Sequence, residues 1–149
     1  MRGTPTPAEI HAANARVRRQ IERILDSSRG ACWLRDDRVA TLVSKALTFF
    51  DTERYLQIAW CVMPNHVHTV FTLLGENDIS DVMASWKRFT SHEANRVLGR
   101  EGMFWQQDYF DVLARSAVHL NRIVQYVANN PAKAGLRNWP YVRVYADRL

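Results

Sequence analysis

Two histidines separated by a single residue, His66 and His68, form the chemical pattern that stands out most in the chain. They follow directly on Met63-Pro64-Asn65, which separates two apolar runs. Alternate side chains of a strand share a face, so both imidazoles would lie together, and such a pair can bind a divalent metal. Most pairs of this kind are hydrogen-bonded or surface histidines, and the residues alone leave both interpretations open. In either case we expect both side chains to be partly exposed.

A second candidate is Tyr126, which lies in a segment with helical periodicity and is followed four residues later by Asn130. Residues at this spacing project from the same face of a helix. Arg122 and Asn129 flank the same region. The alternative is that Tyr126 is an aromatic residue at the edge of the core, which is the usual role of an isolated tyrosine.

The charge of the chain is compatible with a polyanionic partner. The net charge is +5, the isoelectric point is about 9.6, and 17 of the 20 basic residues are arginines, whose planar guanidinium groups bind phosphate through two hydrogen bonds. Basic and aromatic residues also alternate in Trp86-Lys87-Arg88-Phe89, a combination that can bind single-stranded nucleic acid. A solvated basic surface explains the charge equally well, and for Trp86 and Phe89 we favour a place in the core.

The length of 149 residues suits one domain, residues 1–149. No apolar run is long enough to span a membrane, and the first residues lack the apolar region of a signal peptide. Cys32 and Cys61 form no metal-binding or disulfide pattern, so we expect reduced thiols and a cytoplasmic protein. The sequence contains no glycine-rich phosphate loop.

The order of elements predicts an α+β fold with helices packed on one face of a small antiparallel sheet. Apolar spacing predicts a first helix ending near Leu25, and Asp36 or Asp37 is expected to cap a second one. An antiparallel hairpin follows, with Pro131 expected to stop the last helix. The predicted ranges are helices at about 7–25, 37–51, 79–98 and 117–129, strands at 55–62 and 66–74, and an extended segment at 109–115.

Three segments together resemble the single-tyrosine HUH transposases, and within them the REP-associated tyrosine transposases. The first is Val62-Met63-Pro64-Asn65-His66-Val67-His68, which resembles the His-hydrophobe-His signature. The second runs from Phe104-Trp105-Gln106 through Tyr109-Phe110-Asp111 to Arg115 and resembles the segment before the tyrosine helix. The third, residues 126–136, resembles the tyrosine helix itself. The resemblance covers roughly residues 30–140.

This resemblance implies a ferredoxin-like sheet, a divalent metal on His66 and His68, and Tyr126 as the nucleophile. Asn130 would stand near the third ligand position, where the wider superfamily often has glutamine. The family also has a first strand beside the histidine strand, and we find no candidate for that strand in this chain. A missing central strand would leave unpaired backbone beside the site.

The implied function is a metal-dependent endonuclease and strand transferase that cuts single-stranded DNA next to a hairpin through a 5′-phosphotyrosine bond. The cofactor would be Mg²⁺ or Mn²⁺, and the protein would be a cytoplasmic, nucleoid-associated monomer or homodimer without membrane contact. Two alternatives stay open: a catalytically decayed, transposase-derived DNA-binding module, and a metal hydrolase that uses water. The basic residues expected to contact DNA are Lys87, Arg88, Arg115, Arg122 and Lys133.

Overall fold

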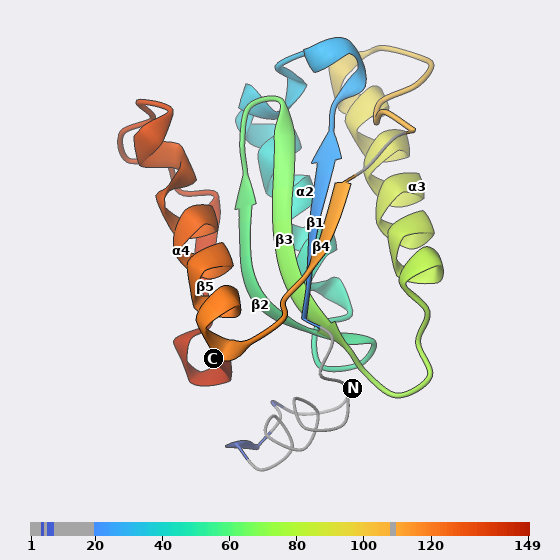
Figure 1. Ribbon diagram of the computed structural model, residues 1–149. Helices are drawn as coiled ribbons and strands as arrows, with labels where there is room; N and C mark the ends of the chain where they lie inside the picture. Colours follow the sequence, from blue (N-terminus) through green and yellow to red (C-terminus); the bar gives the residue numbers. More distant parts are fainter. Residues whose placement is uncertain (1–3, 5, 8–19, 108–109) are drawn as a thin grey trace.

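The computed structural model describes residues 4, 6–7, 20–107 and 110–149 (Figure 1). Its sheet has five strands in the order β4-β1-β3-β2-β5, and each neighbouring pair is antiparallel. The predicted α+β class and antiparallel sheet are therefore confirmed. The strands are β1 (Gln20–Asp26), β2 (Tyr55–Val62), β3 (His66–Leu73), β4 (Phe110–Leu113) and β5 (Val142–Val144), and the longer helices are α2 (Asp37–Phe49), α3 (Ile79–Leu98) and α4 (Ala117–Lys133).

The hairpin of β2 and β3 forms where the sequence predicts it. Both strands are rich in β-branched and aromatic residues, and all eight residues of β2 are buried. Pro64 lies in the turn, where its missing N–H breaks no ladder bond, and the turn is closed by the Met63 N–H donating to the His66 carbonyl (2.7 Å). The hairpin thus places His66 and His68 at one end of the sheet.

The strand that we could not find in the sequence is β1, in the centre of the sheet between β3 and β4. The predicted helix is therefore wrong for residues 20–25, which belong to β1, and residues 8–19 of that prediction lie outside the described residues. The apolar residues at positions 21, 24 and 25 are compatible with the spacing of a helix and with a buried strand. The charged residues Glu22 and Arg23 also argue against a buried strand in the sequence, because charged side chains are uncommon in a core, yet both are buried in the structure.

The helices are divided between the two faces of the sheet and do not all lie on one face as predicted. Because side chains alternate along β3, Val67 and Phe71 join one buried cluster, with α2 and α3, whereas Val70 joins another, with α4. The second face is needed because β2 is apolar on both sides. As a result, the last helix packs on the same face as His66 and His68.

The last helix does not stop before Pro131 as predicted, but continues to Lys133. A proline near the end of a helix removes only one intrahelical hydrogen bond, and Pro131 is buried. The chain then returns along β2, where the Trp139 indole N–H donates to the Val62 carbonyl (2.7 Å) and β5 pairs with β2. None of the helices in the described part of the chain is long and apolar enough to cross a membrane.

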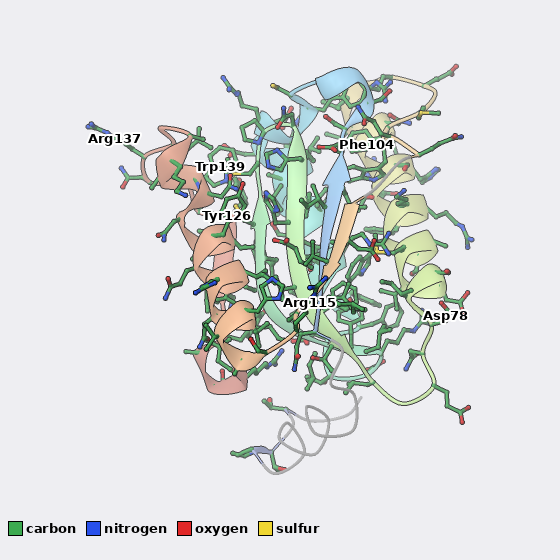
Figure 2. The ribbon with its side chains drawn as sticks, viewed as in Figure 1. Asp78, Phe104, Arg115, Tyr126, Arg137 and Trp139 are labelled. Atoms are coloured by element: carbon green, nitrogen blue, oxygen red, sulfur yellow. The ribbon has the colours of Figure 1, made fainter. Side chains whose placement is uncertain are left out.

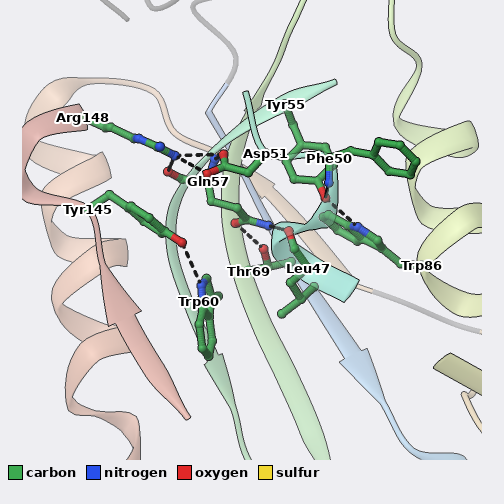
Figure 3. A network of polar contacts seen from close by, with 10 residues as sticks. All are labelled: Leu47, Phe50, Asp51, Tyr55, Gln57, Trp60, Thr69, Trp86, Tyr145 and Arg148. Atoms are coloured by element: carbon green, nitrogen blue, oxygen red, sulfur yellow. Dashed lines mark hydrogen bonds and ion pairs between the residues drawn. The ribbon is translucent and has the colours of Figure 1, made fainter. Parts of the chain in front are cut away.

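A buried polar network fastens the end of the chain to β2 (Figure 3). Arg148 donates to both carboxylate oxygens of Asp51 and to the Gln57 carbonyl, each at 2.9 Å. The Gln57 amide donates to the Leu47 carbonyl (2.8 Å) and accepts from the Thr69 hydroxyl (2.9 Å). Thus the core near α2 depends on satisfied polar groups as well as on apolar packing.

Candidate active site

The structure brings together the four residues singled out for metal binding and nucleophilic attack. His66 and His68 extend from β3 toward α4, which supplies Tyr126 and Asn130 (α4 and Tyr126 in Figure 2). The two His Nε2 atoms are 3.1 Å apart, and the Asn130 Nδ2 atom lies 3.2 Å from His68 Nε2. The spacing in sequence could predict each pair, but only the packing of α4 on this face joins them.

The burial of the site is uneven. His68 is 3% exposed and Asn130 is 8% exposed, whereas Tyr126 is 49% exposed. His66 is half-buried, as expected, but the expectation that His68 is partly exposed is wrong, because α4 and β1 close over it. The site therefore combines a buried histidine with an accessible phenol.

Burial also keeps the imidazoles neutral. Burial and, to a smaller extent, the neighbouring His66 together lower the pKa of His68 to about 4. Burial lowers the pKa of His66 as well, against the opposing effect of Asp26, which lies opposite His66 in the β1–β3 ladder. At neutral pH each ring therefore has one nitrogen with a free lone pair, which is the form that binds metals.

The donor atoms fit a divalent ion. Two ligands at right angles around an ion with bonds of ~2.1 Å lie about 3.0 Å apart, close to the observed 3.1 Å between the Nε2 atoms. The amide orientation of Asn130 is an assignment, and turning the amide over would present Oδ1 to the same point. Among the described residues, no three or more His, Cys, Asp or Glu side chains are grouped so that they could hold a metal ion. An ion held by His66, His68 and Asn130 would have three protein ligands and would keep positions open for substrate oxygens.

Tyr126 lies directly beside this cluster. Its ring centroid is 5.6 Å from that of His68, with the planes at 85°, and Lys133 Nζ lies 5.3 Å from the Tyr126 ring. An exposed phenol next to a possible metal site, with a lysine nearby, can be reached by an anionic substrate.

The basic residues expected to contact DNA fall into two groups. Arg115, Arg122 and Lys133 are exposed just before or along α4, on the face of the site (Arg115 in Figure 2). Lys87 and Arg88 lie on α3, which covers the opposite face, and Lys87 donates to the Gln106 carbonyl (3.4 Å). The structure therefore does not bring Lys87 and Arg88 to the site.

The sequence interpretation missed the acidic residues of β1. Glu22, Ile24 and Asp26 alternate onto the face that carries the histidines, and the Glu22 Oε2 atom lies 3.8 Å from His68 Nδ1. Burial raises the pKa of the Glu22 carboxyl. The signal that could have found these residues is the period-two alternation of residues 20–26, which the assumption of a helix concealed.

Comparison with known proteins agrees with the resemblance to transposases found in the sequence. The family described as "Transposase IS200 like" matches residues 32–130. A Haemophilus influenzae protein assigned as a REP-associated tyrosine transposase is 25% identical over an alignment of 104 residues, with coverage of 60% of this chain and 59% of that protein. The REP-associated tyrosine transposase of Escherichia coli is 28% identical over 94 residues, covering 60% of this chain and 54% of that protein. This chain thus spans less than two thirds of the length of either relative.

Two solved structures share the fold. The structure of a REP-associated tyrosine transposase bound to a REP hairpin aligns with a TM-score of 0.68 and 19% identity, over 89% of this chain and 86% of that one. A crystal structure assigned as a transposase from Deinococcus radiodurans aligns with a TM-score of 0.52 and 18% identity, over 87% and 95%. At these identities the likeness concerns the fold alone.

Proposed function

Because the chain belongs to the family of IS200-like transposases, we propose that it is a metal-dependent endonuclease and strand transferase acting on single-stranded DNA. The observation that carries the proposal is the convergence of His66, His68, Tyr126 and Asn130 from two separate elements. In this proposal the two histidines and the Asn130 amide hold Mg²⁺ or Mn²⁺. The presence of β1 beside β3 removes the structural reason for assuming a decayed site.

Tyr126 performs the chemical step. The phenol oxygen attacks phosphorus, the bond from phosphorus to the 3′ oxygen breaks, and the products are a 5′-phosphotyrosine and a free 3′-hydroxyl. The phenol proton passes to solvent, and the departing 3′ oxygen takes up a proton. A divalent ion, when bound, supplies Lewis-acid polarisation of the scissile phosphate. Because the phosphodiester energy is kept in the tyrosine ester, a second 3′-hydroxyl can reverse the step without ATP.

The substrate proposed is a DNA strand next to a hairpin, in the nucleoid of the cytoplasm. One structural relative has a REP hairpin bound, and in this chain Arg115, Arg122 and Lys133 give the exposed side of α4 a positive charge suited to phosphates. In this proposal the active protein is a monomer or a homodimer. Lys87 and Arg88 are not part of this surface.

The test is incubation of a hairpin-bearing single-stranded oligonucleotide with the protein and Mn²⁺ or Mg²⁺, followed by denaturing electrophoresis. A covalent adduct should form, and Tyr126→Phe should abolish it while binding is retained. The control Tyr141→Phe removes a hydroxyl that donates to Asp37 on the other face of the sheet, and it should leave the adduct. An adduct that survives Tyr126→Phe would refute the mechanism. Salt-dependent binding without an adduct would support the non-catalytic module, and cleavage without an adduct would support a hydrolase that uses water.

A further inference from the structure

We propose that Glu22 is a positioning residue that accepts the Nδ1 hydrogen of His68 and so directs the His68 Nε2 lone pair into the metal site. This inference rests on the proposed function, because it assigns Glu22 a part in the same site. Glu22 does not touch the reacting atoms, and it acts only through His68.

The two atoms concerned are buried and face each other. Glu22 is 8% exposed and His68 is 3% exposed. Glu22 Oε2 and His68 Nδ1 are 3.8 Å apart, and within the described part of the chain neither atom has a hydrogen-bond partner. Leaving a buried donor and a buried acceptor unpaired is unfavourable, so a small rotation that joins them is favoured. The distance needs to shorten by about 1 Å to reach a hydrogen bond.

The sheet fixes this pair in place. Ile24 is directly opposite His68 in the β1–β3 ladder, and Glu22 is two residues along, which is the diagonal position on the same face. On its other side Glu22 pairs with Val112 of β4, so β1 is held by ladders on both edges. The carboxylate therefore belongs to a rigid part of the sheet.

The other histidine has a matching arrangement. His66 Nδ1 lies 2.6 Å from the Asn65 Oδ1 atom, so an oxygen acceptor also stands at the Nδ1 side of that ring. The Nε2 atoms of both rings meet each other at 3.1 Å, and Asn130 approaches on that side. Each ring thus has an oxygen at Nδ1 and a metal-facing Nε2. A buried oxygen that holds the outer nitrogen of a ligand histidine fixes its tautomer and orientation.

Glu22 is not placed as a metal ligand. It lies at the Nδ1 edge of the His68 ring, whereas His66 and Asn130 gather at the Nε2 edge. A second explanation is that Glu22 is a buried carboxylate with a purely structural effect on β1. The two explanations differ in what they predict for the His68 tautomer and for metal affinity.

The experiment compares wild type with Glu22→Gln, which keeps an oxygen acceptor, and Glu22→Leu, which removes it. Nitrogen-15 NMR of the metal-free protein at pH 7 should show His68 with its hydrogen on Nδ1 in wild type and a mixture of tautomers in Glu22→Leu. Manganese binding, followed by electron paramagnetic resonance, should weaken about 10- to 100-fold in Glu22→Leu and less in Glu22→Gln. Thr72→Val, which removes a buried hydroxyl on the same face of the sheet, is the matched control.

The proposal is overturned if wild-type His68 carries its hydrogen on Nε2, or if Glu22→Leu binds Mn²⁺ within twofold of the control. Both measurements are made without DNA, so they are separate from the covalent-adduct test. If Mn²⁺ binds and responds to Glu22 but no adduct forms, the proposed function fails and the role of Glu22 stands. If wild type binds no Mn²⁺, the proposal fails together with the metal site.

Discussion

Replacing Arg148 by methionine should destabilise the fold by about 3 kcal/mol. Arg148 and Asp51 are 7% and 13% exposed, and the guanidinium donates to both carboxylate oxygens and to the Gln57 carbonyl. Removing one partner of a buried ion pair costs about 3–5 kcal/mol, because the other charge is left behind. The lower value applies here, since Asp51 keeps a hydrogen bond from the Gln57 N–H (2.9 Å) and has some exposure to water.

The free energy of unfolding would be measured by urea denaturation with tryptophan fluorescence. For a chain of this length, about 3 kcal/mol corresponds to a loss of roughly 6–12 °C in Tm. The double variant Arg148→Met/Asp51→Asn should recover part of the loss, because it removes the unpaired charge. Arg38→Met, which breaks the exposed pair with Asp36 (2.8 Å), should leave the midpoint unchanged. If Arg148→Met costs less than about 1 kcal/mol, then burial does not make this ion pair important and the reasoning fails.

Three further predictions concern the site and the core. His68→Ala should lower the free energy of unfolding, measured by urea denaturation, by about 2 kcal/mol, because the imidazole is buried. His66→Ala should lower it clearly less, because His66 is only half-buried, and equal losses would contradict the burial argument. Burial raises the pKa of Tyr55 to about 12, so the unfolded chain loses its proton first and stability should fall from about pH 10 upward, by up to about 2–3 kcal/mol at pH 12. Tyr55→Phe should flatten that fall, and an unchanged slope would exclude Tyr55 as its source. Arg122→Ala should weaken DNA binding and reduce by about one the magnitude of the slope of log K for DNA binding against log salt concentration. Arg88→Ala, on the opposite face of the sheet, should change neither the affinity nor this slope.

The parts of the fold that the sequence predicts are those set by local rules. The Met63-Pro64-Asn65 turn and the β-branched runs beside it define a hairpin without help from the rest of the chain. Asp36 and Asp78 accept hydrogen bonds from the backbone two residues later and so mark the starts of α2 and α3. These signals act over a few residues, so one sequence contains them in full.

The parts that escaped prediction depend on contacts between distant segments. Residues 20–26 become a strand because β3 and β4 offer free edges on both sides, although Glu22 and Arg23 are poor indicators of a buried strand. Likewise, the face on which α4 packs follows from β2 being apolar on both sides. The periodicity of apolar residues and their helix and strand propensities do not distinguish between such tertiary arrangements.

For the site, the spacing of His66 and His68 gives a pair on one face, and Tyr126 and Asn130 give a second pair on a helix. The approach of Asn130 Nδ2 to 3.2 Å from His68 Nε2, and of the Tyr126 ring to 5.6 Å from the His68 ring, requires the tertiary structure. The burial of His68 and the approach of Glu22 also come from the tertiary structure, because both depend on β1 lying beside β3.

The central place of β1 has a consequence for how the protein is made. β1 precedes the other strands in the chain, yet its two neighbours in the sheet, β3 and β4, are synthesised later, and α4 later still. During translation the β2–β3 hairpin with His66 and His68 is therefore synthesised before α4 and Tyr126. Such long-range pairing slows folding. A chain interrupted before α4 carries the histidines without Tyr126, so under the proposed mechanism it should form no covalent adduct with DNA.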